Sequence, residues 1–269
     1  MSKTILITGS TDGIGRLAAE RLLSQGHRVL LHGRNPKKLE ATAEALTSGG
    51  QRPETFQADL SVMAQVHSLA TAVSTAHPKL DVLINNAGVF NVRQRTTDDD
   101  LDTTFAVNTI APYLLTRRLL TALSGGRVVN LSSAAQAPVD LQALAGRRTL
   151  PEQAAYAQSK LAITAWSYGL AQSLGADGPM IVAVNPGSLL ATKMVKSAFG
   201  VAGSDVGIGA DILVRAALSD EFANASGKYF DNDARRFGSP HPAAHDPGVV
   251  KAIVDGVEAS LATVGTPID

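Results

Sequence analysis

The amino-acid sequence predicts a single α/β domain built on a doubly wound parallel sheet of about seven strands, with helices on both faces. Three observations lead to this prediction. Short apolar, β-branched runs alternate with segments of helical periodicity along most of the 269 residues. The first run is followed at once by a glycine-rich turn and an amphipathic segment. Polar residues of unusual character follow several other runs, and in such a sheet this is the edge where ligands bind.

The expected elements follow from this alternation. Strands are expected at 3–8, 28–32, 54–58, 80–84, 127–131, 181–184 and 228–230. Helices are expected at 16–25, 36–46, 61–76, 99–123, 152–175, 205–218 and 247–261, with Ser61 as an N-cap. The acidic run 98–100 is typical of a helix N-terminus rather than of a metal site. We expect one domain over 1–269, a substrate lid at 188–204 and a polar loop at 231–247.

Composition excludes several classes of function. The formal net charge is zero, so no broad basic surface for nucleic acid is indicated. The chain has no cysteine, which excludes disulfides, thiolate catalysis and Cys-ligated metals, and its six histidines form no metal-binding pattern. No segment reaches the apolar length of a membrane span, and the first strand begins too early to leave room for a signal peptide. A cytoplasmic protein without a metal, membrane or nucleic-acid partner is therefore expected.

The glycine-rich turn indicates a dinucleotide site. Glycines at 9, 13 and 15 allow a tight turn, a close approach of the backbone to a pyrophosphate, and close packing of the helix on the strand. Unpaired N–H groups at the start of the helix favour the negative charge of phosphates. The predicted phosphate-binding residues are Gly9, Ser10, Thr11, Asp12, Gly13, Ile14 and Gly15.

Arg34 indicates which dinucleotide is bound. The end of the second strand is where an acidic residue would accept hydrogen bonds from an adenosine 2′-hydroxyl and repel a 2′-phosphate. Positions 32–35 hold no Asp or Glu, and the planar guanidinium of Arg34 suits a phosphate. NADP(H) is therefore favoured over NAD(H), although Asp12 argues mildly against this preference.

Tyr156 and Lys160 suggest acid–base chemistry. They are spaced i, i+4, so they share one helix face. A nearby ammonium favours the phenolate and would lower the pKa of the tyrosine, which could then exchange a proton with a carbonyl or alcohol oxygen. Ser133, after the fifth strand, could hydrogen-bond the same oxygen. Taken alone, however, the pair could equally be a tyrosine and a lysine that merely share a helix surface.

The combined motifs resemble those of the short-chain dehydrogenase/reductase family. They are Thr8–Gly15, Asn85-Asn86-Ala87-Gly88, Asn108, Ser133, Tyr156-Ala157-Gln158-Ser159-Lys160 and Pro186-Gly187. The resemblance covers nearly everything from Thr4 to about Thr192 and implies a Rossmann fold and an NAD(P)-dependent oxidoreductase. From Gly227 onward the chain is more weakly similar to retinol-dehydrogenase-like and carbonyl-reductase-like members.

The resemblance also implies a role for each matched residue. Tyr156 would be the general acid/base, Lys160 would lower its pKa and bind the nicotinamide ribose, and Ser133 would orient the substrate oxygen. Asn108 would hold a water molecule in a proton relay to Lys160. The implied cofactor contacts are Arg34 for a 2′-phosphate, Asp59 and Leu60 for the adenine, Asn86, Ala87 and Gly88 for the cofactor's backbone side, and Pro186, Gly187 and Leu189 for the nicotinamide carboxamide.

Two departures from the family pattern affect the substrate side. Thr192 lies five residues after Gly187 rather than four, so its cofactor contact is not assigned. The 134–155 segment is longer than in many members and could line the substrate entrance. The family implies homodimers paired through the long helices after strands four and five, but this segment could block that face and leave a monomer.

The predicted activity is interconversion of a small apolar ketone or aldehyde and its alcohol. The alternative is a catalytically silent NADP-binding sensor or scaffold, although such proteins usually lose the tyrosine or the lysine that this chain retains. A serine hydrolase is not supported, because the chain has no Gly-x-Ser-x-Gly elbow. Candidates for the apolar substrate pocket are Phe90, Val92, Ala135, Trp166, Leu189, Met194 and Phe199, of which Trp166 could equally belong to the core.

Overall fold

The computed structural model describes residues 1–47, 49–188, 190, 203 and 205–268. Its sheet has the strand order β3-β2-β1-β4-β5-β6-β7-β8, and every neighbouring pair up to β7 is parallel. The strands are β1 (Thr4–Ile7), β2 (Arg28–Gly33), β3 (Glu54–Gln57), β4 (Val82–Asn85), β5 (Arg127–Leu131), β6 (Met180–Asn185), β7 (Tyr229–Asp231) and β8 (Arg236–Gly238). The predicted doubly wound sheet is confirmed, with its topological switch between β1 and β4.

The eighth strand corrects the prediction of a polar loop over 231–247. β8 pairs antiparallel with β7, so that Phe237 lies opposite Phe230 and Arg236 lies opposite Asp231. Phe237 also packs edge-on against Phe222. Three residues are too few to show an alternating pattern in the sequence, and this edge strand depends on the aromatic cluster that it covers. The same stretch also contains the short helix η4 (Pro242–His245).

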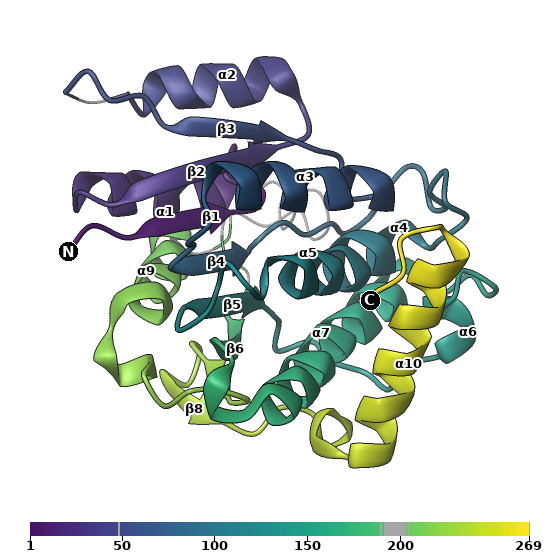
Figure 1. Cartoon of the computed structure of the whole chain (residues 1–269). Helices are drawn as coiled ribbons and strands as arrows, with labels where there is room; N and C mark the ends of the chain where they lie inside the picture. The colour runs from purple at the N-terminus through teal and green to yellow at the C-terminus, as the bar shows by residue number, and fades with distance from the viewer. Residues whose placement is uncertain (48, 189, 191–202, 204, 269) are drawn as a thin grey trace.

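Helices cover both faces of the sheet (Figure 1). One face packs against α1 (Gly13–Ser24), α2 (Pro36–Ala45) and α9 (Val206–Leu218), and the other against α3 (Met63–Ala76), α5 (Ala111–Leu119) and α7 (Glu152–Leu174). Alternate residues of β1 divide between the two cores: Leu6 faces the α3/α5/α7 side, whereas Ile5 and Ile7 face the α1/α9 side. This alternation explains why the central strands are apolar throughout.

The helix predicted at 99–123 is interrupted. It comprises α4 (Thr103–Phe105), the π-helix η1 (Ala106–Ile110) and α5, with Asn108 inside the π-helical turn. Pro112 has no N–H, so the carbonyl of Asn108 has no α-helical donor four residues ahead, and a wider turn relieves the crowding by the proline ring. The proline signal was visible in the sequence, but the π-helical turn was not predicted.

The start of α3 corrects two capping predictions. The N-cap residue is Val62, not Ser61, whose hydroxyl instead donates to the Asp59 carboxylate at 2.7 Å. The Asp99 carboxylate accepts from the backbone N–H of Met63 at 2.8 Å, so it caps α3 from a distant part of the chain. Asp102, rather than the 98–100 run, caps its own helix by accepting from Thr104 N–H at 2.9 Å. Asp99 and Met63 are 36 residues apart, so local patterning could not assign this cap, whereas Asp102 caps a residue only two positions ahead.

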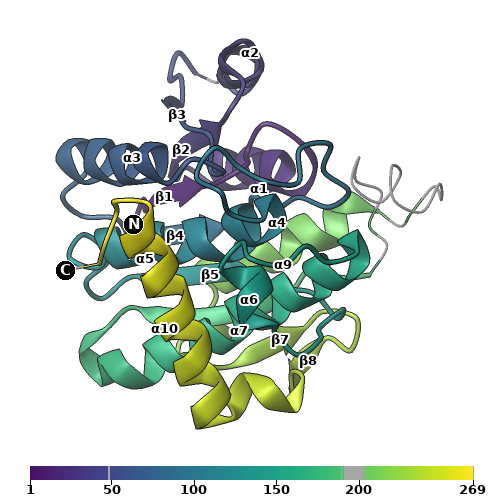
Figure 2. The same cartoon turned by 90° about the vertical axis from the view of Figure 1, so that its right-hand side faces the viewer.

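The C-terminal helix α10 (Pro247–Thr263) lies across the outer side of α5 and α7 (Figure 2). Arg117 on α5 pairs with Glu258 on α10 at 2.9 Å. The α7–α10 approach is close, because a Cβ added at Gly169 would lie 2.6 Å from Val250 Cγ1. The 134–155 segment contains the short helix α6 (Leu141–Leu144), which packs against α10. The remaining short helices are η2 (Gly175–Asp177) and η3 (Asp220–Phe222).

Across the described part of the chain, no helix is both long and apolar enough to cross a membrane.

Candidate active site

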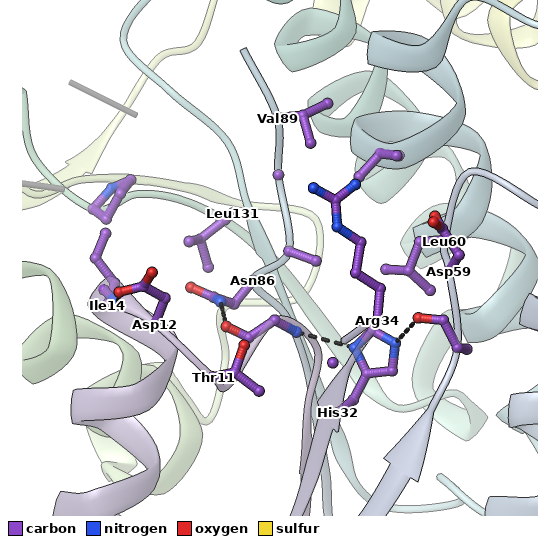
Figure 3. Close-up of a pocket in the computed structure, with 18 of the residues that line it drawn as sticks. Thr11, Asp12, Ile14, His32, Arg34, Asp59, Leu60, Asn86, Val89 and Leu131 are labelled. Atoms are coloured by element: carbon purple, nitrogen blue, oxygen red, sulfur yellow. Dashed lines mark hydrogen bonds between the residues drawn. The ribbon is translucent and has the colours of Figure 1, made fainter. Parts of the chain in front are cut away.

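A cavity of about 460 Å³ opens at the carboxyl ends of the parallel strands (Figure 3). Most of the residues predicted to bind the cofactor lie on its wall. They are Gly9, Thr11, Asp12, Gly13, Ile14, Arg34, Asp59, Leu60, Asn86, Ala87, Gly88, Tyr156, Lys160 and Pro186. The predicted residues that lie beside the cavity rather than on its wall are Ser10, Gly15, Asn108, Ser133 and Gly187. Leu189 falls outside the described residues.

The glycine turn is braced by the segment after β4. Gly9 has φ +66°, and a Cβ there would lie 2.9 Å from the Cα of Ala87. A Cβ at Gly15 would lie 2.3 Å from Asn86 Nδ2. That amide nitrogen donates to the carbonyls of Thr8 at 2.8 Å and Gly9 at 3.2 Å. Asn86 therefore holds the turn in shape, and glycine is needed because the two segments touch.

Ser10 supports the turn from behind. Its side chain is buried, and its hydroxyl donates to the carbonyl of His32 at 3.2 Å and accepts from the N–H of His32 at 2.9 Å. Because both hydrogen bonds of the Ser10 hydroxyl go to the end of β2, Ser10 ties the turn after β1 to β2 and does not present its side chain to the cavity. Ser10 was predicted among the phosphate contacts, and no local pattern indicates this bond because its partner lies 22 residues away.

His32 is a cavity residue that the sequence analysis did not identify. Its Nδ1 accepts from Gly9 N–H at 3.1 Å, and its Nε2 donates to the carbonyl of Ala58 at 3.1 Å. These bonds require the neutral ring with its proton on Nε2. Burial lowers the pKa of His32 to about 4, which keeps the ring neutral near pH 7. The feature of the sequence that could have identified His32 is its position at the end of β2, because ligands bind at this edge of the sheet.

Two cations flank the end of β2. Arg34 is exposed and extends along the side of the cavity that carries Asp59 and Leu60 (Figure 3). Lys38, in the first turn of α2, pairs with the Asp12 carboxylate at 2.7 Å. Asp12 also caps α1 by accepting from Gly13 N–H at 2.9 Å. The negative charge that argued against a 2′-phosphate is thus balanced by a lysine that the sequence analysis did not consider.

The catalytic candidates gather on the β5 and α7 side of the same cavity. Tyr156 is half-buried, and its ring packs edge-on against Phe90 with centroids 5.2 Å apart. Burial raises the pKa of Tyr156 above its ordinary value, and its hydrogen bond with Ser133 offsets this only in part. In the protein chain alone, the predicted lowering of the tyrosine pKa by Lys160 does not outweigh burial.

Lys160 is held beneath Tyr156. It is 4% exposed, its Nζ donates to the carbonyl of Leu131 at 2.8 Å, and it lies 5.6 Å from the centre of the Tyr156 ring. Burial lowers its pKa to about 8. An ammonium so placed loses part of its hydration and has one backbone acceptor, so its remaining donors can serve a ligand in the cavity.

Asn108 ties the segment after β4 to α7. Its Oδ1 accepts from Val89 N–H at 2.8 Å, and its Nδ2 donates to the carbonyl of Val89 at 3.0 Å and to Ser159 Oγ at 3.1 Å. A Cβ at Gly88 would lie 3.4 Å from Asn108 Oδ1 and 3.7 Å from Lys160 Nζ, so both side chains converge beside this glycine. Both polar atoms of the Asn108 side-chain amide are therefore hydrogen-bonded within the protein. The backbone carbonyl of Asn108 is the group that Pro112 leaves without an α-helical donor.

The two serines after β5 have different surroundings. Ser132 is buried and its hydroxyl lies 2.6 Å from Thr164 Oγ1, which gives it a structural role. Ser133 is half-buried and hydrogen-bonds Tyr156. Its carbonyl accepts from Gln136 Nε2 at 2.9 Å and from the Tyr229 hydroxyl at 3.1 Å. The two serines therefore have different environments, and the contacts of Ser133 with Gln136 and Tyr229 were not predicted from the sequence.

The proposed substrate-pocket residues do not all gather here. Trp166 belongs to the core: it is fully buried and packs edge-on against Tyr113. Phe90 and Val92 line an adjoining cavity that shares Arg34 and Asp59 with the first. Ala135 is exposed. Leu189, Met194 and Phe199, and most of the proposed lid at 188–204, lie outside the described residues.

Comparison with known proteins identifies the family. The profile described as short chain dehydrogenase matches residues 3–203.

The chain belongs to the short-chain dehydrogenase/reductase family.

Relatives within the family support a retinol-dehydrogenase-like short-chain dehydrogenase. Human retinol dehydrogenase 13 is 30% identical over 278 residues, covering 93% of this chain and 82% of the relative. A Streptomyces sp. (strain C5) protein that carries the name daunorubicin C-13 ketoreductase is 40% identical over 149 residues, which span 54% of this chain and about half (52%) of the relative. A short-chain dehydrogenase from Shigella flexneri, solved with NADP, superposes with a TM-score of 0.68 at 29% identity, covering 86% of this chain and 97% of that one.

Membership establishes an NAD(P)-dependent oxidoreductase of the ketone/alcohol class, and the cavity fits a nicotinamide dinucleotide. At the glycine turn the backbone is bare, since side chains at Gly9 or Gly15 would collide with neighbouring atoms. At the other side the Tyr156 phenol, Ser133 hydroxyl and Lys160 ammonium face one region. The cavity therefore joins a bare glycine turn at one side to a phenol, a hydroxyl and an ammonium at the other.

Proposed function

We propose that this protein is an NADP(H)-dependent oxidoreductase that interconverts a small apolar ketone or aldehyde and its alcohol. The observation that carries the proposal is that Tyr156 and Lys160 line the cavity whose opposite side is the glycine turn, with Ser133 hydrogen-bonded to Tyr156 beside it. When bound, the nicotinamide ring would supply or accept the hydride at the substrate carbon. The protein supplies binding, orientation and the proton.

The proton would pass through Tyr156. In the reductive direction the substrate oxygen accepts hydrogen bonds from the Ser133 hydroxyl and the Tyr156 phenol, which hold it in place. The Tyr156 hydroxyl then gives its proton to that oxygen, and in the oxidative direction the phenolate takes it back. Lys160, 5.6 Å from the phenol ring, stabilises the phenolate that forms. Asn108 is a positioning residue whose backbone carbonyl offers a site for the water of a relay to Lys160.

The preference for NADP(H) is supported by charge at the end of β2. Arg34 can form a planar, bidentate contact with a 2′-phosphate, and positions 32–35 lack the carboxylate that would repel it. Lys38 balances the charge of Asp12 at 2.7 Å. The Shigella flexneri neighbour was solved with NADP. Asp59 and Leu60 would meet the adenine beside Arg34.

The substrate class rests on the apolar residues near Tyr156 and on the names of the relatives. Phe90 packs edge-on against Tyr156, so an apolar group bonded to the reacting carbonyl would contact this ring. Retinol dehydrogenase and daunorubicin ketoreductase both name hydrophobic alcohols or ketones as substrates. A screen with hydrophobic aldehydes and aryl ketones is therefore the appropriate first search for turnover.

Fluorescence titration with NADPH and NADH tests the proposal. We expect wild type to bind NADPH more tightly than NADH, and Arg34→Ala to weaken NADPH binding by about 10–100-fold with little change for NADH, because one charge-assisted contact is lost. Arg28→Ala is the matched control, since Arg28 is exposed at the opposite end of β2. If NADH binds wild type as well as NADPH does and Arg34→Ala changes neither affinity, the NADP assignment is wrong.

Turnover separates the enzyme from the silent sensor or scaffold. An enzyme should oxidise NADPH in the presence of at least one hydrophobic carbonyl compound, and this oxidation should require Tyr156. A protein that binds NADPH tightly but fails with every carbonyl and alcohol tested would favour the sensor.

A further inference from the structure

The turn between β7 and β8 holds the loop that follows β6. Asp233, in this turn, accepts three hydrogen bonds from that region: Ser188 N–H at 2.8 Å, the Ser188 hydroxyl at 2.6 Å and Asn185 Nδ2 at 2.9 Å. Three donors converge on one carboxylate across 45 or more residues of sequence. Such charge-assisted bonds are stronger than bonds between neutral groups.

Asn185 links Asp233 to Gly187 through its side-chain amide. Its side chain is buried, and its Nδ2 also donates to the Asp231 carboxylate at 2.9 Å, while its Oδ1 accepts from Gly187 N–H at 3.2 Å. Both ends of this amide are therefore used, and Asp231 and Asp233 together fix which way the amide faces. Gly187 itself has φ +122°, a conformation that is open to glycine and strained for other residues.

A neighbouring side chain holds the other end of the same loop. Asn232 Nδ2 donates to the carbonyl of Pro186 at 2.9 Å, and Asn232 N–H donates to the carbonyl of Asn185 at 3.2 Å. Pro186 lies on the wall of the cavity. The short segment from Pro186 to Ser188 has no regular structure of its own, so these bonds from the β7–β8 turn determine its position.

The same C-terminal strand also reaches the catalytic serine. The Tyr229 hydroxyl, on β7, donates to the carbonyl of Ser133 at 3.1 Å. Burial is the main cause that raises the pKa of Tyr229 well above its ordinary value, so this hydroxyl keeps its proton and remains a donor. Segments on both sides of the catalytic end are thus anchored to residues 229–233, which lie outside the 3–203 region matched by the family profile.

The bonds to Asp233 require a carboxylate. Partial burial alone would raise its pKa, but hydrogen bonds from Ser188 and Asn185 outweigh this effect and leave the pKa below its ordinary value. An asparagine at this position would present an NH₂ group to at least one donor, because all three partners of Asp233 are donors. Asp233→Asn therefore breaks the contact with almost no change in size.

We propose that Asp233 is a positioning residue for the nicotinamide end of the cofactor site, acting through the Pro186–Ser188 loop. This inference rests on the proposed function, because it assigns the loop to the nicotinamide rather than to the adenosine half of NADP(H). Asp233 would touch neither cofactor nor substrate. Asp233 would instead set the position of the backbone groups of Pro186, Gly187 and Ser188, and these groups would contact the nicotinamide half of the cofactor.

Binding of whole and truncated cofactor tests this role without relying on turnover. The dissociation constants of NADPH and of 2′,5′-ADP, which lacks the nicotinamide half, are measured by titration calorimetry for wild type, Asp233→Asn and Ser188→Ala. We expect Asp233→Asn to weaken NADPH binding about tenfold and to change 2′,5′-ADP binding less than twofold. Ser188→Ala should weaken NADPH binding in the same direction but about threefold, because Asp233 keeps two of its three donors.

Asp246→Asn is the matched control. Asp246 caps α10 by accepting from Val249 N–H at 3.0 Å, and asparagine is also a good N-cap, so neither ligand should be affected. Equal weakening of NADPH and 2′,5′-ADP by Asp233→Asn would overturn the positioning role in favour of a general structural one, and so would unchanged NADPH binding in both loop variants. If wild type binds neither ligand, the proposed function itself fails.

Discussion

The two ends of the cavity are built in different ways. The end where we propose that the adenosine half binds, called the adenosine end, is formed mainly by residues 9–34 and 58–60 with the adjoining segment 86–88, and it presents backbone groups and exposed charges such as Arg34. The catalytic end combines residues from three distant parts of the chain, around 107, 131 and 156–160, and its lysine is 4% exposed. One end is centred on a local sequence motif that Asn86 and His32 brace from elsewhere in the chain, and the other is assembled from residues that are far apart in the sequence.

The two ends of the cavity differ most in how far water screens their charged groups. At the adenosine end, Asp12 and Lys38 are each more than two-fifths exposed and are screened by water. At the catalytic end, burial lowers the pKa of Lys160 to about 8 and raises that of Tyr156. Substitutions at the catalytic end should therefore change chemistry and pH dependence, whereas those at the adenosine end should change affinity. His32 is the exception, because it is a buried titrating group at the adenosine end.

The largest expected effect is that of Tyr156→Phe. Loss of the phenol proton should lower kcat by about 10²–10⁴-fold, the usual contribution of a positioned general acid or base. NADPH binding should change less than twofold, because the ring and its packing against Phe90 are retained. Steady-state kinetics with an accepted carbonyl compound and a parallel NADPH titration measure the two effects.

Tyr168→Phe is the control for this substitution. Tyr168 lies on the same helix, away from the cavity and against His245. Turnover in Tyr156→Phe above a tenth of the wild-type rate would remove Tyr156 as the proton-transfer group.

Lys160→Met should show the second-largest effect, as a pH-dependent change in stability. The folded pKa of Lys160, about 8, lies below the ordinary lysine value of 10.5, so between these values the unfolded chain binds the proton and the folded chain does not. The free energy of unfolding of wild type should therefore rise with pH in this window. Relative to Lys160→Met, it should rise by about 2–3 kcal/mol from pH 7.5 to 10.

Urea unfolding at both pH values measures the difference between wild type and Lys160→Met. Lys251→Met, at an exposed position on α10, is the control and should give a flat difference. A flat difference for Lys160→Met as well would mean that burial does not perturb Lys160.

The smallest effect should come from His32→Gln at acid pH. The folded pKa of His32, about 4, lies below the ordinary value of 6.5, so the unfolded chain takes up a proton first as the pH falls. Wild type should lose about 2 kcal/mol of stability relative to the variant between pH 6.5 and 4.5. Below that range, protonation of the ring would also remove the acceptor for Gly9 N–H.

Thermal or urea unfolding at a series of pH values measures this loss. His67→Gln, at an exposed position on α3, is the control for removing a histidine. Parallel pH profiles for wild type and His32→Gln would show that His32 is not a buried neutral residue.

Local patterns in the sequence predicted the elements that depend on near neighbours. The βα alternation predicted the seven parallel strands in order, and the glycine turn, Arg34 and the i, i+4 pair of Tyr156 and Lys160 are all evident in the sequence alone. These signals are local because strand alternation, turn conformation and helix spacing each involve residues within a few positions. Family motifs then joined Asn108 and Ser133 to the pair.

The tertiary structure decided the contacts between residues far apart in the chain. His32 contacts Gly9 and Ala58 across 23 and 26 residues, and Asp233 meets Ser188 across 45. The strand β8, the α3 cap from Asp99, and the burial of Trp166 likewise depend on which crossovers bring segments together. No periodicity encodes such pairings, because they follow from the packing of whole elements. The sequence alone thus determined which chemical groups the protein carries, and the folded packing determined which are buried, paired and held in position.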